Sequence, residues 1–236
     1  MLLMITNEGG FLPIEVALNQ APTYTLLTDG TLIYPGPVPA IFPGPMLPNM
    51  QQVRLTGDQM EDIRVLIEAI GLPEIDDYVN NEASNFVADA SSTVAIYVDD
   101  AGVTHRMSVY ALGMQETMPD ELANLALLRD TLDSFAYGTP GGVAYTSDRV
   151  ILRVLQGGSF DPEFEDTRPW EFDFEPGDVT DRMTDIPCRV LEGDAAGEVR
   201  TLLSDATQVT QWEHATGKFT VLARDLLPGE SGCDSQ

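Results

Sequence analysis

The sequence predicts an α+β fold in which antiparallel sheets carry their helices packed on one face. Two observations indicate this class: β-rich runs occur in pairs around tight turns, and each of the first two pairs is followed by an amphipathic helical pattern. The resulting order, ββαββα, favours one antiparallel sheet with both helices on the same side. The pattern then restarts, so we expect a first domain over residues 11–142 and a smaller β-rich domain over residues 145–236.

Two hairpins are predicted in the first domain. Asp29-Gly30 stands between the β-rich runs "TYTLLT" and "TLIY", and an Asp-Gly pair in that setting is a strong hairpin signal. The turn "DDAG" at residues 99–102 connects "STVAIYV" to "VTHRMSVYAL" in the same way. Residues 74–90, which precede the second hairpin, are expected to form an irregular acidic connection.

Two helices follow the hairpins. Thr56 and Gln59 have the spacing of a capping box, and Gly71 is typical of a helix end. The apolar positions between them fall on one face: Met60, Ile63, Leu66, Ile67 and Ile70. The second helix is predicted to begin at Pro119 and to end at Gly138, with its apolar face formed by Leu122, Leu125, Leu128, Leu132 and Phe135.

The second domain is predicted from shorter segments. "DRVILRVL" at residues 148–155 and "PCRVL" at residues 187–191 are typical of strands. "GDAAGEVRTLLSDA" favours a short helix capped by Asp194. "TQVTQWEH" and "KFTVLARDLL" favour a last hairpin across residues 215–217.

The chain is strongly acidic. It has 38 acidic and 12 basic residues among 236, which gives a net charge of −26. Nucleic acid and anionic lipid headgroups repel such a chain, so neither is expected as a partner. Two explanations stay open: the acidic surface keeps an exported or salt-exposed protein soluble, or it serves as a dedicated site for cations or for a basic partner.

No transmembrane segment is predicted in this chain. No apolar run is long enough to span a bilayer, and "MLLMITNEGG" lacks the basic n-region, the long apolar h-region and the A-x-A site of a signal peptide. If the protein is exported, we expect its natural start to lie upstream or its leader to have been removed.

The two cysteines, Cys188 and Cys233, are not spaced as zinc ligands. We favour a disulfide between them, which would fasten the C-terminal tail and contribute roughly 4 kcal/mol by closing a loop. Two free thiols are the alternative. A disulfide implies an oxidising compartment, so an extracellular or envelope location is expected.

Motifs of known catalytic chemistry are missing from the sequence. There is no nucleophile elbow, no H-E-x-x-H, no Walker loop and no dinucleotide-binding glycine pattern. His105 and His214 are each expected at a surface or a turn rather than in a catalytic triad. We therefore predict no catalytic residue and no enzyme activity.

The acidic and aromatic stretch "FDPEFEDTRPWEFDFEPGD" offers one metal hypothesis. Its carboxylates and backbone could bind calcium, although their spacing does not match an EF-hand loop. Two alternatives are a solvated loop whose aromatic rings tuck under the second domain, and an edge strand at "WEFDFE". No other cofactor is expected. The candidate calcium ligands are Asp173, Glu175, Gly177, Asp178 and Asp181.

The segment "YPGPVPAIFPGPMLP" at residues 34–48 holds six prolines. Proline fixes φ and lacks a backbone donor, so residues 35–48 are predicted to form a stiff arm of polyproline II or turns. In one interpretation the arm packs on its own sheet; in the other it is a preformed docking arm for another protein. Its candidate partner-binding residues are Tyr34, Ile41, Phe42, Met46 and Leu47.

Several longer strings resemble one protein family. "YTLLTDGTLIYPGP", "RLTGDQMEDIRVLIEAIGL", "TVAIYVDDAGVTHRMSVYAL", "PCRVLEGDAAGEVRTLL" and "ARDLLPGESGC" are similar to segments of uncharacterised exported proteins and lipoproteins of actinobacteria and related bacteria. Family members usually begin with a lipoprotein signal and an acylated cysteine, which this sequence does not contain. The resemblance implies export and supports the Cys188–Cys233 bridge; the family has no established activity, so no catalytic residue is carried over.

These observations favour a non-enzymatic exported or cell-envelope protein that acts through protein–protein contact, as a lipoprotein-type module, an accessory subunit or a component of a surface assembly. Its partner would be another envelope protein or a second copy of itself. Two other functions stay open: an inhibitor-like or ligand-capturing module, and a hydrolase that uses acidic residues with or without calcium.

Overall fold

The computed structural model describes residues 2–156, 166–181, 184–215 and 217–233. The chain forms two compact units, each built around its own sheet. The first unit contains Met1–Pro13, Pro22–Gly36 and Met50–Tyr145, and the second contains Ile14–Ala21, Pro37–Asn49 and Thr146–Gln236. The mixture of helices with mainly antiparallel sheets confirms the predicted α+β class.

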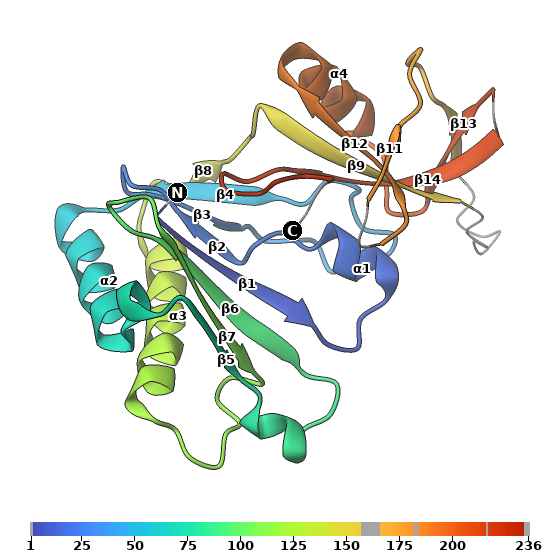
Figure 1. The fold of residues 1–236 in the computed structure, drawn as a ribbon. Coiled ribbons are helices and arrows are strands. Elements are labelled where there is room, and N and C mark those ends of the chain that lie inside the picture. The colour runs from blue at the N-terminus through green and yellow to red at the C-terminus, as the bar shows by residue number, and fades with distance from the viewer. Residues whose placement is uncertain (1, 157–165, 182–183, 216, 234–236) are drawn as a thin grey trace. The chain divides into compact units, whose positions relative to one another are not determined.

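The first unit holds an eight-stranded sheet with the order β5-β7-β6-β1-β2-β3-β4-β8 (Figure 1). Its neighbouring strands are antiparallel except for β5, which is parallel to β7. The strands are β1 (Leu3–Gly9), β2 (Tyr24–Leu26), β3 (Thr31–Pro35), β4 (Met50–Arg54), β5 (Asp77–Asn80), β6 (Ser91–Val98), β7 (Thr104–Tyr110) and β8 (Val143–Ala144). Both predicted hairpins are confirmed, as β2–β3 and β6–β7.

Two helices, α2 (Gly57–Ile70) and α3 (Asp120–Gly138), lie side by side on one face of this sheet (Figure 1). The capping box of α2 is present in full: the Thr56 side chain accepts from the N–H of Gln59, and the Gln59 side chain accepts from the N–H of Thr56. Gly71 ends the helix at a φ of 76°, a left-handed conformation that glycine adopts without strain. These local signals explain why this helix could be located accurately from sequence.

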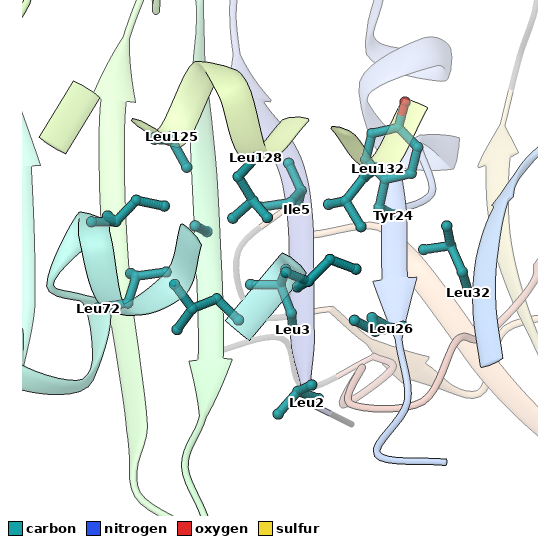
Figure 2. Close-up of a cluster of buried hydrophobic side chains, with 14 of the residues drawn as sticks. Leu2, Leu3, Ile5, Tyr24, Leu26, Leu32, Leu72, Leu125, Leu128 and Leu132 are labelled. Carbon is teal, nitrogen blue, oxygen red and sulfur yellow. The ribbon is translucent and has the colours of Figure 1, made fainter. Parts of the chain in front are cut away.

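The core of the first unit lies between the two helices and the sheet. Figure 2 shows Leu125, Leu128 and Leu132 of α3 on the side of the helix that faces the sheet, in the same cluster as Leu3 and Ile5 of β1. All five side chains are almost fully buried. The predicted leucine stripe of α3 therefore forms the core-facing side of the helix, as expected.

Residues 74–90 differ from the irregular connection expected there. They include the end of a short 3-10 helix (Leu72–Glu74), the strand β5 and a second 3-10 helix (Glu82–Asn85). β5 is short and polar, with the sequence "DYVN", so its pairing with β7 is a tertiary effect that no periodicity reveals.

The second unit holds a six-stranded sheet with the order β10-β13-β14-β9-β12-β11, in which β10 is parallel to β13. The strands are β9 (Arg149–Gln156), β10 (Asp166–Pro169), β11 (Val179–Thr180), β12 (Pro187–Glu192), β13 (Thr210–His214) and β14 (Gly217–Asp225). Its helices are α1 (Ile14–Asn19) and α4 (Gly193–Leu203). The predicted strands, the short helix and the last hairpin are all present, but α4 begins after Glu192, and no side-chain hydrogen bond caps it.

The division into units differs from the two consecutive domains expected from sequence. Residues 14–21 and 37–49 lie between strands of the first unit along the chain, yet they belong to the second unit. The reason is tertiary packing: α1 lies against the second sheet, where the carbonyl of Leu18 accepts from Arg153 Nη1 at 2.9 Å, and Met46 enters the second core. Turn signals mark where the chain bends and not which core a segment joins.

Candidate docking site

The second half of the proline segment is fastened to the second unit. The N–H of Met46 donates to the carbonyl of Ala206, and the N–H of Gln208 donates to the carbonyl of Gly44, each at 3.0 Å. An isolated antiparallel bridge at Pro45 joins the same two segments. Prolines have no N–H to donate, so Met46 supplies the segment's donor for this pair of bonds, while the carbonyl of Gly44 accepts.

Met46 is the apolar anchor of this half. Its side chain is 4% exposed and lies in the core cluster of the second unit, and Leu47 packs against the same cluster. Tyr34 is also buried, in the first unit, where its ring meets that of Tyr137 edge-on at 5.2 Å. The burial of Tyr34 and Met46 corrects the expectation that both are displayed to a partner.

The first half of the segment forms an exposed tip, which we define as Pro37–Phe42. Val38, Ile41 and Phe42 are 59%, 67% and 66% exposed. At the base, Asn49 Nδ2 donates to the carbonyl of Pro37 at 2.9 Å and so joins the two ends of the loop. The tip thus presents apolar side chains on a loop that is held at its base and beyond its far end.

The tip lies in a part of the chain without charge. No charged residue stands between Asp29 and Arg54. Large apolar side chains that are exposed together, on a segment with few degrees of freedom, are typical of the centre of a protein interface.

The acidic residues considered for calcium have separate surroundings. Asp173 is exposed, whereas Glu175 Oε1 lies 3.1 Å from His214 Nδ1 and Asp178 Oδ2 lies 3.0 Å from Arg189 Nη2. Within the described residues, no group of three or more histidine, cysteine, aspartate or glutamate side chains is arranged to hold a metal ion. The geometry therefore offers the calcium hypothesis no support.

Asp181, the remaining candidate, belongs to a buried polar cluster. It is 1% exposed, and its Oδ2 lies 3.7 Å from Arg153 Nη2. Nearby, Arg224 donates to both carboxylate oxygens of Glu230 at 2.7 Å. Burial and then the guanidinium of Arg224 lower the pKa of Arg153, while Asp181 and Glu230 oppose that shift. The four charges compensate one another inside the unit, which is a structural role.

The aromatic residues of the acidic stretch pack inward from a loop. Trp170 is buried, and Phe172 and Phe174 stack on each other at 5.0 Å against the second core. Residues 170–175 form no strand, so the edge-strand alternative is wrong and the loop alternative fits. Gly177 approaches Pro187 so closely that a Cβ would lie 2.7 Å from it, which explains the glycine. Phe160 and Phe164 lie outside the described residues.

The two histidines occupy different environments. His105 is 5% exposed within β7, which corrects the expectation of a surface or turn position. Its Nδ1 lies 2.8 Å from the carbonyl oxygen of Ile75, and its Nε2 lies 3.4 Å from Asp99 Oδ2. A hydrogen bond from the N–H of Val103, and the contact with His105, lower the pKa of Asp99. His214 ends β13 beside the last hairpin turn, as expected.

The predicted disulfide is confirmed. Cys188 of β12 and Cys233 of the tail are bonded, with their Cα atoms 5.7 Å apart. Both are buried with Ile151 and Leu226 in a small cluster. The bond fastens the tail that carries Glu230 across the second sheet.

Comparisons with known proteins give no relative: no family model matches the chain, and neither a curated protein nor a solved structure is similar to it. Among the described residues, no helix has the length and apolar character needed to cross a membrane.

The sequence had indicated the proline segment as a candidate surface, but Val38 was not among the residues singled out. The alternation of proline and apolar residues in "PVPAIFP" could have indicated it.

Proposed function

We propose that the protein is a non-enzymatic exported or cell-envelope protein that acts by binding another protein, and that the tip Pro37–Phe42 makes this contact. The observation that carries the proposal is the exposure of Val38, Ile41 and Phe42 on a loop fixed by the buried Met46. A loop that is already ordered loses little conformational entropy on binding, so more of its apolar contact is available as affinity.

The disulfide supports the location in this proposal. A bond between Cys188 and Cys233 is compatible with an oxidising, extracellular setting. This agrees with the proposed kinship to exported proteins and lipoproteins.

An inhibitor that enters the cleft of an enzyme is a second candidate function, because an anchored apolar loop is also suited to filling a cleft. The two candidates differ in their partner. An assembly subunit binds a structural protein or receptor, whereas an inhibitor abolishes the turnover of an enzyme when the two are mixed in equal amounts.

Binding by the tip can be tested with uncharged substitutions that leave the buried Met46 in place. We would compare the wild-type chain with a Val38→Ser, Ile41→Ser variant as baits in a pull-down from the native envelope. Replacing the whole proline segment would also delete Met46 and damage the second core. The matched control is a Val65→Ser, Val103→Ser variant, whose substituted side chains are 54% and 49% exposed elsewhere on the protein.

A partner recovered by the wild type and the control, but not by the tip variant, is the expected result. Equal recovery of every bound protein by all three baits would refute the proposal. Thermal unfolding of each bait checks that the substitutions leave the fold unchanged, as expected for exposed positions.

A further inference from the structure

We infer that the partner of the tip Pro37–Phe42 carries an apolar pocket surrounded by basic side chains. This inference rests on the proposed function and concerns the chemistry of the partner. The tip supplies apolar contact only, because no charged residue stands between Asp29 and Arg54. Orientation and rate of approach must therefore come from charges on the rest of the unit that contains the tip.

The second unit, which contains the tip, has an acidic surplus because its described arginines are already paired with carboxylates. Every arginine that the structure describes in this unit lies beside a carboxylate of the same unit. The pairs are Arg149–Glu192, Arg153–Asp181, Arg168–Asp166, Arg168–Asp205, Arg189–Asp178, Arg200–Asp225 and Arg224–Glu230.

Acidic side chains outnumber these arginines, and the surplus reaches solvent. Glu15, Glu171, Asp173 and Asp194 of the second unit are all exposed. The acidic surplus is thus a property of the unit that holds the tip, and a basic partner would complement it.

The net charge also disfavours two other binding partners for the tip, a second copy of the chain and an anionic membrane. Two copies of the chain would each bring a net charge of −26, and their repulsion is only partly screened at physiological salt, where the Debye length is about 8 Å. An anionic membrane surface is disfavoured for the same reason. A basic protein surface is instead attracted by the negative charge that repels a second copy of the chain or an anionic membrane.

The experiment places a photo-reactive phenylalanine analogue at position 41 of the full chain in native cells. The control chain carries the analogue at position 65, an exposed apolar position on α2. The protein that cross-links from position 41 is identified and purified, and its association and dissociation rates with the wild type and with the Ile41→Ser variant are measured at low and at high sodium chloride.

The inference predicts a basic partner whose association rate falls at least tenfold between about 20 and 300 mM salt, as in electrostatically steered complexes. The Ile41→Ser variant should dissociate at least tenfold faster and keep the same dependence of association on salt, because it removes apolar contact without changing charge.

Three results would refute the inference of a basic partner without refuting the proposed docking function of the tip. They are a specific cross-link from position 41 to a second copy of the chain, a specific cross-link to an acidic protein, and an association rate that salt does not lower. Cross-linking to lipid would overturn the choice of a protein partner. Absence of any product specific to position 41 over position 65 would sink the proposed function itself, and the inference with it.

Discussion

Loss of the Cys188–Cys233 disulfide is expected to destabilise the second unit by about 4 kcal/mol. The two cysteines are separated by 45 residues, and the entropy of closing a loop of that length gives this figure in the chain-entropy model. The figure is large beside the 5–15 kcal/mol that typically stabilises a domain. The tail keeps other contacts, including the paired hydrogen bonds between Arg224 and Glu230, so the reduced unit should stay folded in water.

The measurement is unfolding in urea followed by tryptophan fluorescence. Trp170 and Trp212 are the two tryptophans of the chain, and both belong to the second unit, so their emission reports that unit selectively. With a urea dependence of about 2 kcal/mol per molar, the midpoint should fall by about 2 M. The samples are the oxidised wild type, the wild type with a phosphine reductant, and a Cys188→Ala, Cys233→Ala variant.

The two disulfide-free samples separate the cross-link from packing. The reduced wild type keeps both sulfur atoms in their buried cluster with Ile151 and Leu226, whereas the double alanine variant loses them. Reductant should leave the midpoint of the alanine variant unchanged. If the urea midpoint of the reduced wild type decreases by less than about 0.5 M, the loop-closure reasoning is refuted.

Three further outcomes are expected. Met46→Ala should destabilise the second unit by about 2–5 kcal/mol in the same fluorescence assay, since it empties a buried site; an unchanged midpoint would contradict the anchor. Thr56→Ala should cost about 1 kcal/mol in unfolding followed by circular dichroism, because it removes the bond to the N–H of Gln59, whereas Thr56→Ser should cost much less. The hydrogen bond from the N–H of Thr31 lowers the pKa of Asp29 in the folded protein. The Asp29 carboxylate therefore stabilises the hairpin fully above its unfolded pKa of about 4, and this contribution is lost as the pH falls through the lower folded pKa. A carbon-13 titration that gives Asp29 an ordinary pKa would refute this.

Elements with local signals could be predicted from the sequence. The Asp29-Gly30 hairpin, the helix between Thr56 and Gly71, and the leucine stripe of α3 are each encoded within a few neighbouring residues. The disulfide could be predicted because only two cysteines were available to pair.

Elements that depend on distant contacts could not be predicted. β5 is a polar strand defined by pairing with β7, and residues 14–21 and 37–49 join the second unit across stretches of the first. His105 has an ordinary strand position in the sequence, and only the fold brings Ile75 and Asp99 to its two ring nitrogens.

Prediction from sequence is limited in the same way for single residues of the proline segment. Ile41 and Met46 both stand among prolines in the sequence, so each is equally suited to a partner and to the core. The structure separates them because Ala206 and Gln208 bind the backbone near Met46 and leave Ile41 in solvent.

The second half of the proline segment packs on its own unit, whereas the tip Pro37–Phe42 stays exposed and is the part that the docking interpretation concerns. An apolar loop without an anchor would collapse onto the nearest core or sample many conformations, and either outcome weakens binding. Met46 and the bond from Asn49 to Pro37 oppose both outcomes, because they hold the base of the tip and the chain beyond its far end while Val38 and Ile41 stay exposed. If the tip docks as we propose, Met46 contributes to binding without touching the partner, and the prolines in the tip reduce the entropy that binding would otherwise cost.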